Sequence, residues 1–351
     1  MKTDKSILMN ERIPQSPPVI DPVPEFVDRP LWSVMIPTYN CSQYLIENLR
    51  SVLEQDPGEE YMQIEVVDDC STDTDVEALV RKIGKGRIGY FRQPNNVGSL
   101  RNFETCLNRS TGHYIHLLHG DDRVKQGFYL EIQKVFKTFP EAGAAFTGFT
   151  FVDEQNQRLY DNKELLYEPG VLKNWLSEIA RAQLIQPPAM VVKRPVYEKL
   201  GSFYGVHYGE DWEMWVRIAA NYPVAHSPKK LALYRVHQSN ITSRYFLSGQ
   251  SITDVLKVVD MIQEFLPENE RARVKRFTKK HLAHYFSYTS DKIYHMYGRP
   301  YIALEQSKRA MNMHFSHITF LYWLKIKIKI LIGYKMQREK KWLYRPINFF
   351  R

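Results

Sequence analysis

Apolar stretches alternate with amphipathic ones between residues 31 and 152. Short apolar runs between polar turns predict buried strands, and apolar residues at helical spacing predict the helices that connect them. Five strands are expected, at residues 31–37, 63–67, 88–92, 113–118 and 144–152. Helices are expected between them, at residues 42–55, 76–83, 99–108 and 127–136. This alternation is typical of a mostly parallel sheet with right-handed crossovers.

The alternation weakens after residue 153. Helices are still expected at residues 171–182, 195–200 and 210–220, and extended segments at residues 189–193 and 231–236. From residue 252 onward the pattern is helical, at residues 252–265, 271–297 and 302–313. Residues 318–332 fit helix and strand templates equally poorly, because Lys alternates with Ile in part of this segment. We therefore expect an interfacial segment and leave its conformation open.

The composition is that of an ordinary globular protein of 351 residues, 44% hydrophobic and 25% charged. We expect four parts: a disordered, proline-rich arm at residues 1–29, an α/β domain at 30–245, a helical extension at 246–316 and a basic amphipathic tail at 317–351. An apolar signal core and a run of about 18 apolar residues are both missing from the sequence. Three scattered cysteines predict reduced thiols, which fits the cytoplasm.

Positive charge is concentrated at the C-terminus. Residues 325–351 contain nine Lys or Arg and one Glu, a net charge of +8, whereas the whole chain carries +9. The rest of the chain is therefore nearly neutral, so we expect no nucleic-acid partner. Basic residues interleaved with Ile, Trp and Tyr favour an anionic membrane surface instead. We expect the tail to hold the protein peripherally at the inner face of the cytoplasmic membrane.

Polar side chains follow three of the expected strands. Pro37-Thr38-Tyr39-Asn40 closes the first strand, Asp68-Asp69 the second and Asp121-Asp122 the fourth. The carboxyl ends of parallel strands share one sheet edge, where ligands bind. Carboxylates gathered there suit a divalent cation that is shared with a phosphate. The alternative is that Asp121-Asp122 caps the following helix.

A nucleotide would also explain the carboxylates on the second strand. The imide N–H of a uracil, thymine or guanine base can donate to Asp69 or Asp68. Arg101 follows Gly98 by one helical turn and can face the base or the phosphates. The alternative is an ordinary surface arginine.

Four motifs, taken in order, resemble those of family 2 glycosyltransferases of the GT-A fold. They are Val-Met-Ile-Pro-Thr-Tyr-Asn at 34–40, Val-Val-Asp-Asp-Cys-Ser-Thr-Asp at 66–73, Asn-Val-Gly-Ser-Leu-Arg-Asn at 96–102 and Leu-His-Gly-Asp-Asp at 118–122. The resemblance spans roughly residues 30–240. It implies a Rossmann-like α/β sheet flanked by helices, a nucleotide-sugar donor, a bound Mn²⁺ or Mg²⁺ and inversion at the anomeric carbon. It also implies donor contacts from residues of all four motifs: Pro37, Thr38, Tyr39, Asn40, Asp68, Asp69, Gly98, Arg101, Asp121 and Asp122.

The expected ion site departs from the family pattern at one position. The family's metal motif usually begins with an acid two residues before its key aspartate, and here His119 stands there while Asp121 is kept. Imidazole binds Mn²⁺ but is a poor ligand for Mg²⁺. Either His119 helps to bind Mn²⁺, or it is a structural turn residue. His237 is a further candidate for the diphosphate or the ion, with a structural histidine as the alternative.

Inverting transfer needs a base, because an acceptor hydroxyl is not ionised at neutral pH. Glu210 and Asp211 begin a predicted helix directly after Gly209. This segment resembles the family's Glu-Asp motif, which implies that Asp211 is the base and that Glu210 lies in the donor site. The alternative is that both are charges favoured by the helix dipole. Arg235 or Arg244 is a candidate cation for the leaving group, and Trp212 for stacking on a sugar.

Together these features predict an inverting glycosyltransferase of cell-surface polysaccharide synthesis. Its acceptor is expected to be a glycan or a polyprenyl-linked sugar. A nucleotidyltransferase is a weaker alternative, since Thr38-Tyr39-Asn40 is not a basic, glycine-rich phosphate loop. The non-enzymatic alternative is a membrane-associated scaffold with a disused donor site.

Overall fold

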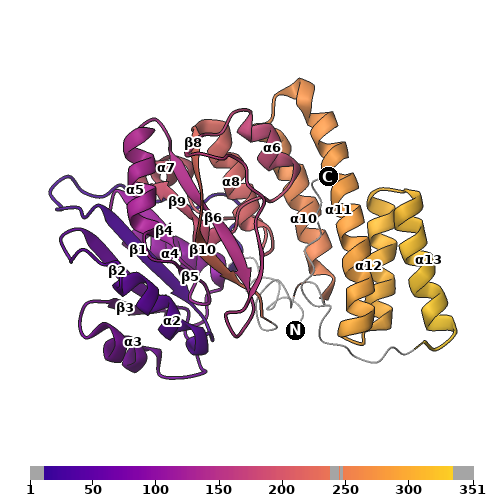
Figure 1. The fold of residues 1–351 in the computed structure, drawn as a ribbon, viewed down its shortest axis with the longest axis horizontal. Coiled ribbons are helices and arrows are strands. Elements are labelled where there is room, and N and C mark those ends of the chain that lie inside the picture. Colours follow the sequence, from indigo (N-terminus) through magenta and orange to yellow (C-terminus); the bar gives the residue numbers. More distant parts are fainter. Residues whose placement is uncertain (1–11, 238–244, 246–247, 335–351) are drawn as a thin grey trace. The chain divides into compact units, whose positions relative to one another are not determined.

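The computed structural model describes residues 12–237, 245 and 248–334 (Figure 1). The chain divides into two compact units. The first comprises Met1–Trp175 and Leu184–Val236, and the second comprises Leu176–Gln183 and His237–Arg351. Residues 176–183 group with the C-terminal helices. The expected domain border at residue 245 stays a prediction.

The first unit is built on one ten-stranded sheet. Its strands are β1 (Trp32–Thr38), β2 (Met62–Asp68), β3 (Gly89–Arg92), β4 (Tyr114–Leu117), β5 (Arg123–Val124), β6 (Ala144–Val152), β7 (Arg158–Asp161), β8 (Gly170–Val171), β9 (Met190–Lys193) and β10 (Val224–Arg235). The order is β3-β2-β1-β4-β9-β6-β10-β5, with β7 on β6 and β8 on β10. The predicted α/β class is thus confirmed.

Parallel pairing holds among β1, β2, β3 and β4 and between β6 and β10. The other strands pair antiparallel, including β9, which lies between β4 and β6. The predicted parallel pairing thus holds among β1 to β4 and between β6 and β10, whereas β5, β7, β8 and β9 are antiparallel additions. The antiparallel strands β5, β7 and β8 have two to four residues each, which is too short for a hydrophobic period to be recognised in the sequence.

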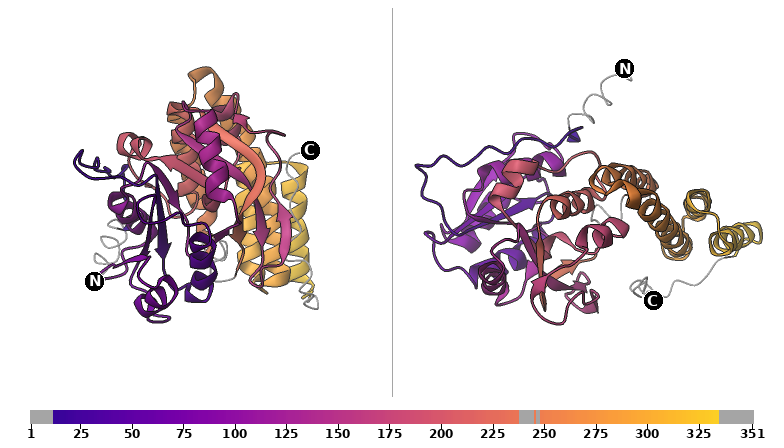
Figure 2. Two further views of the ribbon diagram at one scale, coloured as in Figure 1. Left: turned by 60° about the vertical axis from the view of Figure 1, so that its left-hand side comes forward. Right: turned by 90° about the horizontal axis from the view of Figure 1, so that it is seen from above.

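Helices flank this sheet (Figures 1 and 2). They are α2 (Ser42–Leu53), α3 (Val76–Gly84), α4 (Ser99–Arg109), α5 (Phe128–Thr138), the 3₁₀ turn η1 (Pro187–Ala189), α7 (Arg194–Leu200) and α8 (Glu210–Asn221). The short helix α6 (Trp175–Arg181) begins at the border of the two units. Every residue of β1 is buried. Leu45, Leu49 and Val52 of α2 are likewise fully buried, so the core lies between the sheet and its helices.

The proline-rich N-terminal segment is ordered where the structure describes it, at residues 12–29 (Figure 2). The carbonyls of Pro14 and Pro18 accept hydrogen bonds from the N–H groups of Gly205 and Ser202, both at 2.8 Å. Ile20 is 1% exposed. The expected disorder is therefore wrong for these residues, because proline fixes an extended backbone whose carbonyls remain available as acceptors. Residues 1–11 lie outside the described residues.

The second unit is helical within the described residues. It contains α10 (Gln250–Met261), η2 (Ile262–Phe265), α11 (Glu268–Met296), α12 (Pro300–Met313) and α13 (His317–Leu331). Helices α11, α12 and α13 lie side by side (Figures 1 and 2) around a core that includes Ile293, Ala303 and Ile326. The segment whose conformation the sequence left open is thus the helix α13. None of the described helices is both long and apolar enough to cross a membrane.

Candidate functional site

Three of the expected motifs meet at one edge of the sheet, where β1, β2 and β4 end. The N–H of Asp69 donates to the carbonyl of Thr38 at 2.9 Å, and the N–H of Gly120 donates to the carbonyl of Pro37 at 3.1 Å. A Cβ at Gly120 would lie 2.9 Å from both the Thr38 hydroxyl and the Cys41 sulfur. Only glycine therefore allows the β4 turn to approach β1 this closely.

The loop after β1 contains one exposed ring and one anchoring amide. Tyr39 is 43% exposed, whereas Thr38 is buried. Asn40 has a left-handed φ of 48°. Its side-chain oxygen accepts from the N–H of Thr72 at 2.8 Å, and its own N–H donates to Ser71 at 3.0 Å. Asn40 thus fixes the loop, and Tyr39 is available for a ligand.

The carboxylates of Asp68 and Asp69 anchor the neighbouring loops. Asp68 is fully buried, and its side chain accepts from the Tyr90 hydroxyl at 2.9 Å and from Arg92 at 2.6 Å. Asp69 accepts from the N–H groups of Val97 and Gly98 at 2.6 and 2.9 Å. Contact of either carboxylate with a nucleobase stays a prediction.

Burial raises the pKa of Asp69 to about 6, although the N–H groups of Val97 and Gly98 and the charge of Arg12 oppose the shift. The unfolded chain has a pKa of about 3.9 there. As pH falls through 6, the folded state takes up this proton before the unfolded state does, which stabilises the fold. Lowering the pH from 7 to 5 should therefore stabilise the wild type by about 1.4 kcal/mol relative to Asp69→Asn. Denaturant unfolding of both proteins at each pH measures this difference. The same difference in the free energy of unfolding between wild type and variant at pH 5 and at pH 7 would contradict the prediction.

Arg101 lies in a groove of about 650 Å³ beside the loop after β3. Asn96, Arg109 and Arg12 of the N-terminal segment also line this groove. Arg12 hydrogen-bonds to Asn96, and Arg101 pairs with Glu104 at 2.7 Å. The volume is in the range of small-molecule sites. Arg12 could not be predicted as a groove residue, because it belongs to the segment expected to be disordered.

His119, Asp121 and Asp122 form a cluster in the turn after β4. One ligand atom from each of them lies within 4.8 Å of the other two. Burial lowers the pKa of His119, which favours the neutral imidazole that a metal ion requires. One carboxylate oxygen of Asp122 is buried and has no hydrogen-bond partner. Two carboxylates and an imidazole with this vacant acceptor fit a divalent cation, and Mn²⁺ better than Mg²⁺.

The helix-cap alternative for Asp121 and Asp122 is wrong. The next residues form β5, and α5 begins only after Gly127. The N–H groups of Gly127 and Phe128 donate to the side-chain oxygen of Gln55, at 2.8 and 3.0 Å. The two carboxylates therefore do not cap this helix.

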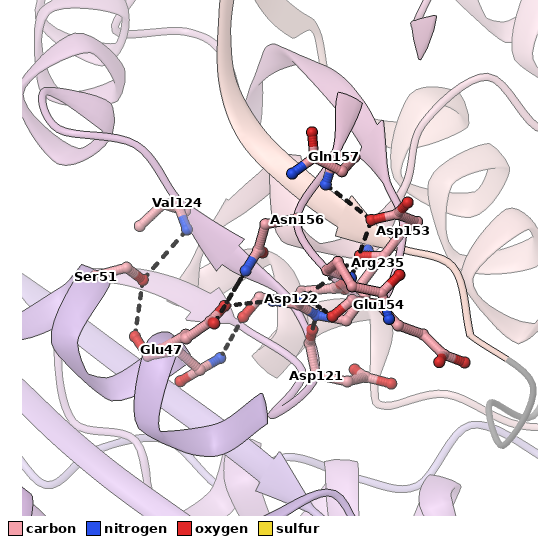
Figure 3. Close-up of polar contacts among 12 residues, drawn as sticks. Glu47, Ser51, Asp121, Asp122, Val124, Asp153, Glu154, Asn156, Gln157 and Arg235 are labelled. Carbon is pink, nitrogen blue, oxygen red and sulfur yellow. Dashed lines mark hydrogen bonds and ion pairs between the residues drawn. The ribbon is translucent and has the colours of Figure 1, made fainter. Parts of the chain in front are cut away.

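Arg235 is buried beside Asp121 and Asp122 of this cluster (Figure 3). Its guanidinium donates to the backbone carbonyls of Asp121, Asp153 and Glu154 and to the carboxylate of Glu47. The expectation that Arg235 is a cation for the leaving group is therefore wrong, since protein groups occupy its donors. Arg244, the other candidate, lies outside the described residues.

Glu210 and Asp211 lie in the first turn of α8, with Gly209 as the N-cap. Only two residues separate α8 from β10, so the helix runs back along the sheet and begins at the edge where β10 ends. Asp211 is 8% exposed, and its carboxylate accepts from the N–H of Trp212 at 2.8 Å. Trp212 is 2% exposed, so the expected stacking on a sugar is wrong and the ring belongs to the core.

His237 is buried and begins the second unit. Its contact with a diphosphate or an ion stays a prediction.

Part of the first unit matches a known family. Residues 33–201 match the profile of glycosyl transferase family 2. These residues are a family 2 glycosyltransferase domain. The putative teichuronic acid biosynthesis glycosyltransferase TuaG of Bacillus subtilis is 24% identical over 241 residues, which cover 67% of this chain and 90% of TuaG.

Solved glycosyltransferases share the fold of this domain. A fragment of TarS from S. aureus in complex with UDP-GlcNAc superposes with a TM-score of 0.60 at 15% identity, covering 88% of this chain and 93% of its own. The mannosyltransferase PcManGT from Pyrobaculum calidifontis, in complex with GDP-Man and Mn²⁺, has a TM-score of 0.54 at 16% identity. The match covers 94% of this chain and 93% of the PcManGT chain. The predicted GT-A fold is therefore confirmed.

Proposed function

We propose that this protein is a metal-dependent, inverting glycosyltransferase that moves a sugar from a nucleoside diphosphate to a hydroxyl of a glycan or lipid-linked acceptor. The observation that carries the proposal is the meeting of the β1, β2 and β4 ends at one sheet edge, beside the His119, Asp121 and Asp122 cluster. The names of TuaG and TarS, and the ligands of the solved structures, are consistent with it.

The nucleotide would lie along the ends of β1 and β2. Tyr39 offers an exposed ring for stacking. The buried carboxylate of Asp69 would accept from an imide N–H in addition to the N–H groups of Val97 and Gly98 that it already binds. Arg101 provides a charged donor within the neighbouring groove. These residues would therefore determine which nucleobase the site prefers.

The diphosphate would lie over the turn after β4. Asp121 and Asp122, with His119, are the residues that would hold the ion. A divalent cation bound there neutralises the negative charge that develops on the leaving diphosphate. The chain itself contributes a turn whose backbone is fixed before the donor arrives, which lowers the cost of reorganisation.

Asp211 would accept the proton of the acceptor hydroxyl. The acceptor oxygen then forms its bond to the anomeric carbon as the bond to the diphosphate breaks on the opposite face, which inverts the configuration. The carboxylate is nearly buried in the first turn of α8, where the helix dipole favours a negative charge.

Release of nucleoside diphosphate tests this proposal. The full chain is incubated with a panel of UDP-, GDP- and dTDP-sugars and Mn²⁺ or Mg²⁺, with and without candidate acceptors. We expect cation-dependent release from one donor, stimulated by an acceptor. Cation-dependent binding without release from any donor would support the scaffold alternative instead.

The exposed side of α13 supports a peripheral membrane location for the enzyme. Phe320, Leu321, Ile328 and Leu331 are exposed, and their helical spacing places them on one side of α13. Lysines flank this side, and Lys327 lies 4.9 Å from the Trp323 ring. An apolar helix side with flanking lysines matches the interface of an anionic bilayer.

Replacing Leu321 and Ile328 by Glu should release the protein from anionic membranes. The change introduces two charges into the apolar side and repels acidic headgroups. Sedimentation with phosphatidylglycerol vesicles measures binding, and we expect at least a tenfold loss. The control is Leu130→Glu, an equally exposed apolar residue on α5 of the other unit. Equal sedimentation of the double variant and the wild type would contradict the membrane proposal.

A further inference from the structure

The guanidinium of the buried Arg235 donates to oxygens of the turn after β4 and of two other segments (Figure 3). Its Nε donates to the carbonyl of Asp121 at 2.9 Å. Its Nη1 lies 3.4 and 3.3 Å from the carbonyls of Asp153 and Glu154 in the β6–β7 turn. Its Nη2 pairs with Glu47 of α2 at 2.7 Å. One side chain of β10 therefore joins the turn after β4 to two other segments, the β6–β7 turn and α2.

Asn48 also binds the turn after β4. Its amide nitrogen donates to the carbonyls of His119 at 2.8 Å and Asp122 at 2.9 Å, and the residue is fully buried. The backbone N–H of Arg235 donates to a carboxylate oxygen of Asp122 at 2.8 Å. The carbonyls of His119, Asp121 and Asp122 are thus all bound by these two side chains.

This arrangement fixes the backbone from which the ion-binding side chains project. The Asp122 carboxylate is bound through one oxygen, and its other oxygen is the buried atom without a partner. Burying a guanidinium is unfavourable unless its donors are all paired, and here backbone carbonyls and Glu47 supply the partners. A planar fork is required, because a lysine ammonium cannot reach the acceptors on both sides at once.

We propose that Arg235 and Asn48 are positioning residues that preorganise the ion site, with Glu47 orienting Arg235. The inference rests on the proposed metal dependence and extends it to residues that contact neither donor nor ion. Residues that orient the ligands of a metal ion typically control its affinity by ten- to hundredfold.

Titration of Mn²⁺ alone into the full chain, followed by electron paramagnetic resonance, tests this inference. We expect Arg235→Lys to weaken Mn²⁺ binding roughly ten- to hundredfold, while binding of metal-free UDP changes by less than about twofold. A loss confined to the ion is not expected from general loosening of the fold. The matched control is Arg158→Lys, a 70% exposed arginine of the adjoining β7 whose partner is Asp161.

Glu47→Gln is a milder second variant, because the side chain is 40% exposed and Gln can still bond to Asn156. We expect it to weaken Mn²⁺ binding several-fold, and it decides the matter if Arg235→Lys does not fold. Mn²⁺ affinity within twofold of the wild type in the folded variants would overturn the positioning role. Absence of Mn²⁺ binding in the wild type would instead overturn the proposed metal dependence.

Discussion

Asp211→Asn should lower the rate of sugar transfer by about 10²- to 10⁴-fold, because an amide cannot accept the proton of the acceptor hydroxyl. The substitution keeps the size of the side chain and the oxygen that accepts from the N–H of Trp212. Donor affinity should therefore stay within about twofold of the wild type. Steady-state transfer assays and calorimetric titration of the nucleotide measure the two quantities separately.

The control for Asp211 is Glu77→Gln, an acid in the first turn of α3. This substitution also removes a negative charge that interacts favourably with a helix dipole, but at a helix that is not part of the proposed site. It should therefore leave the rate of transfer unchanged. Transfer by Asp211→Asn at the wild-type rate would show that Asp211 is only a charge favoured by the helix, and the base would have to be sought elsewhere.

Asp121→Asn is expected to reduce turnover by about 10²-fold or more and to abolish the gain in nucleotide affinity that Mn²⁺ brings. The change removes a charged ligand atom from the cluster with His119 and Asp122. Charge stabilisation by a bound cation is worth several kcal/mol in the transition state, so the loss should appear mainly in kcat. Titration of UDP with and without Mn²⁺ separates the loss of the ion from the loss of the nucleotide.

Asp75→Asn provides the matched control for Asp121. Asp75 is the N-cap of α3 and accepts from the N–H of Ala78 at 2.9 Å. Asparagine caps helices about as well as aspartate, so stability and turnover should both be kept. Full Mn²⁺ stimulation in Asp121→Asn would mean that the ion, if there is one, is held elsewhere.

The part of the fold predictable from the sequence is the part with a strong local signal. Strands β1, β2, β4 and β6 are largely apolar, and their starts and ends differ from the expected ones by one residue at most. Polar turn residues mark the strand ends, which is why the site edge was also predictable. The structure then adds the hydrogen bonds that join these ends.

Other elements depend on contacts that a local pattern does not carry. Strand β10 was expected only at residues 231–236, because Pro228 and two lysines interrupt its apolar pattern and its register shifts there. Residues 170–171 pair with β10 although helix was expected at 171–182. The role of Arg235 depends on distant segments, so it could not be read from its neighbours. Asn48 could have been singled out from the sequence. It is a polar residue on the buried side of α2, beside Leu45 and Leu49, which indicates a buried hydrogen-bonding role.

The central claim is that the ends of β1, β2 and β4 form one nucleotide site with a divalent cation. Calorimetric titration of UDP, GDP and dTDP into the full chain, with and without Mn²⁺, tests it most directly. We expect one of the three nucleotides to bind, and at least tenfold more tightly when Mn²⁺ is present. Failure of all three to bind in either condition would contradict the claim.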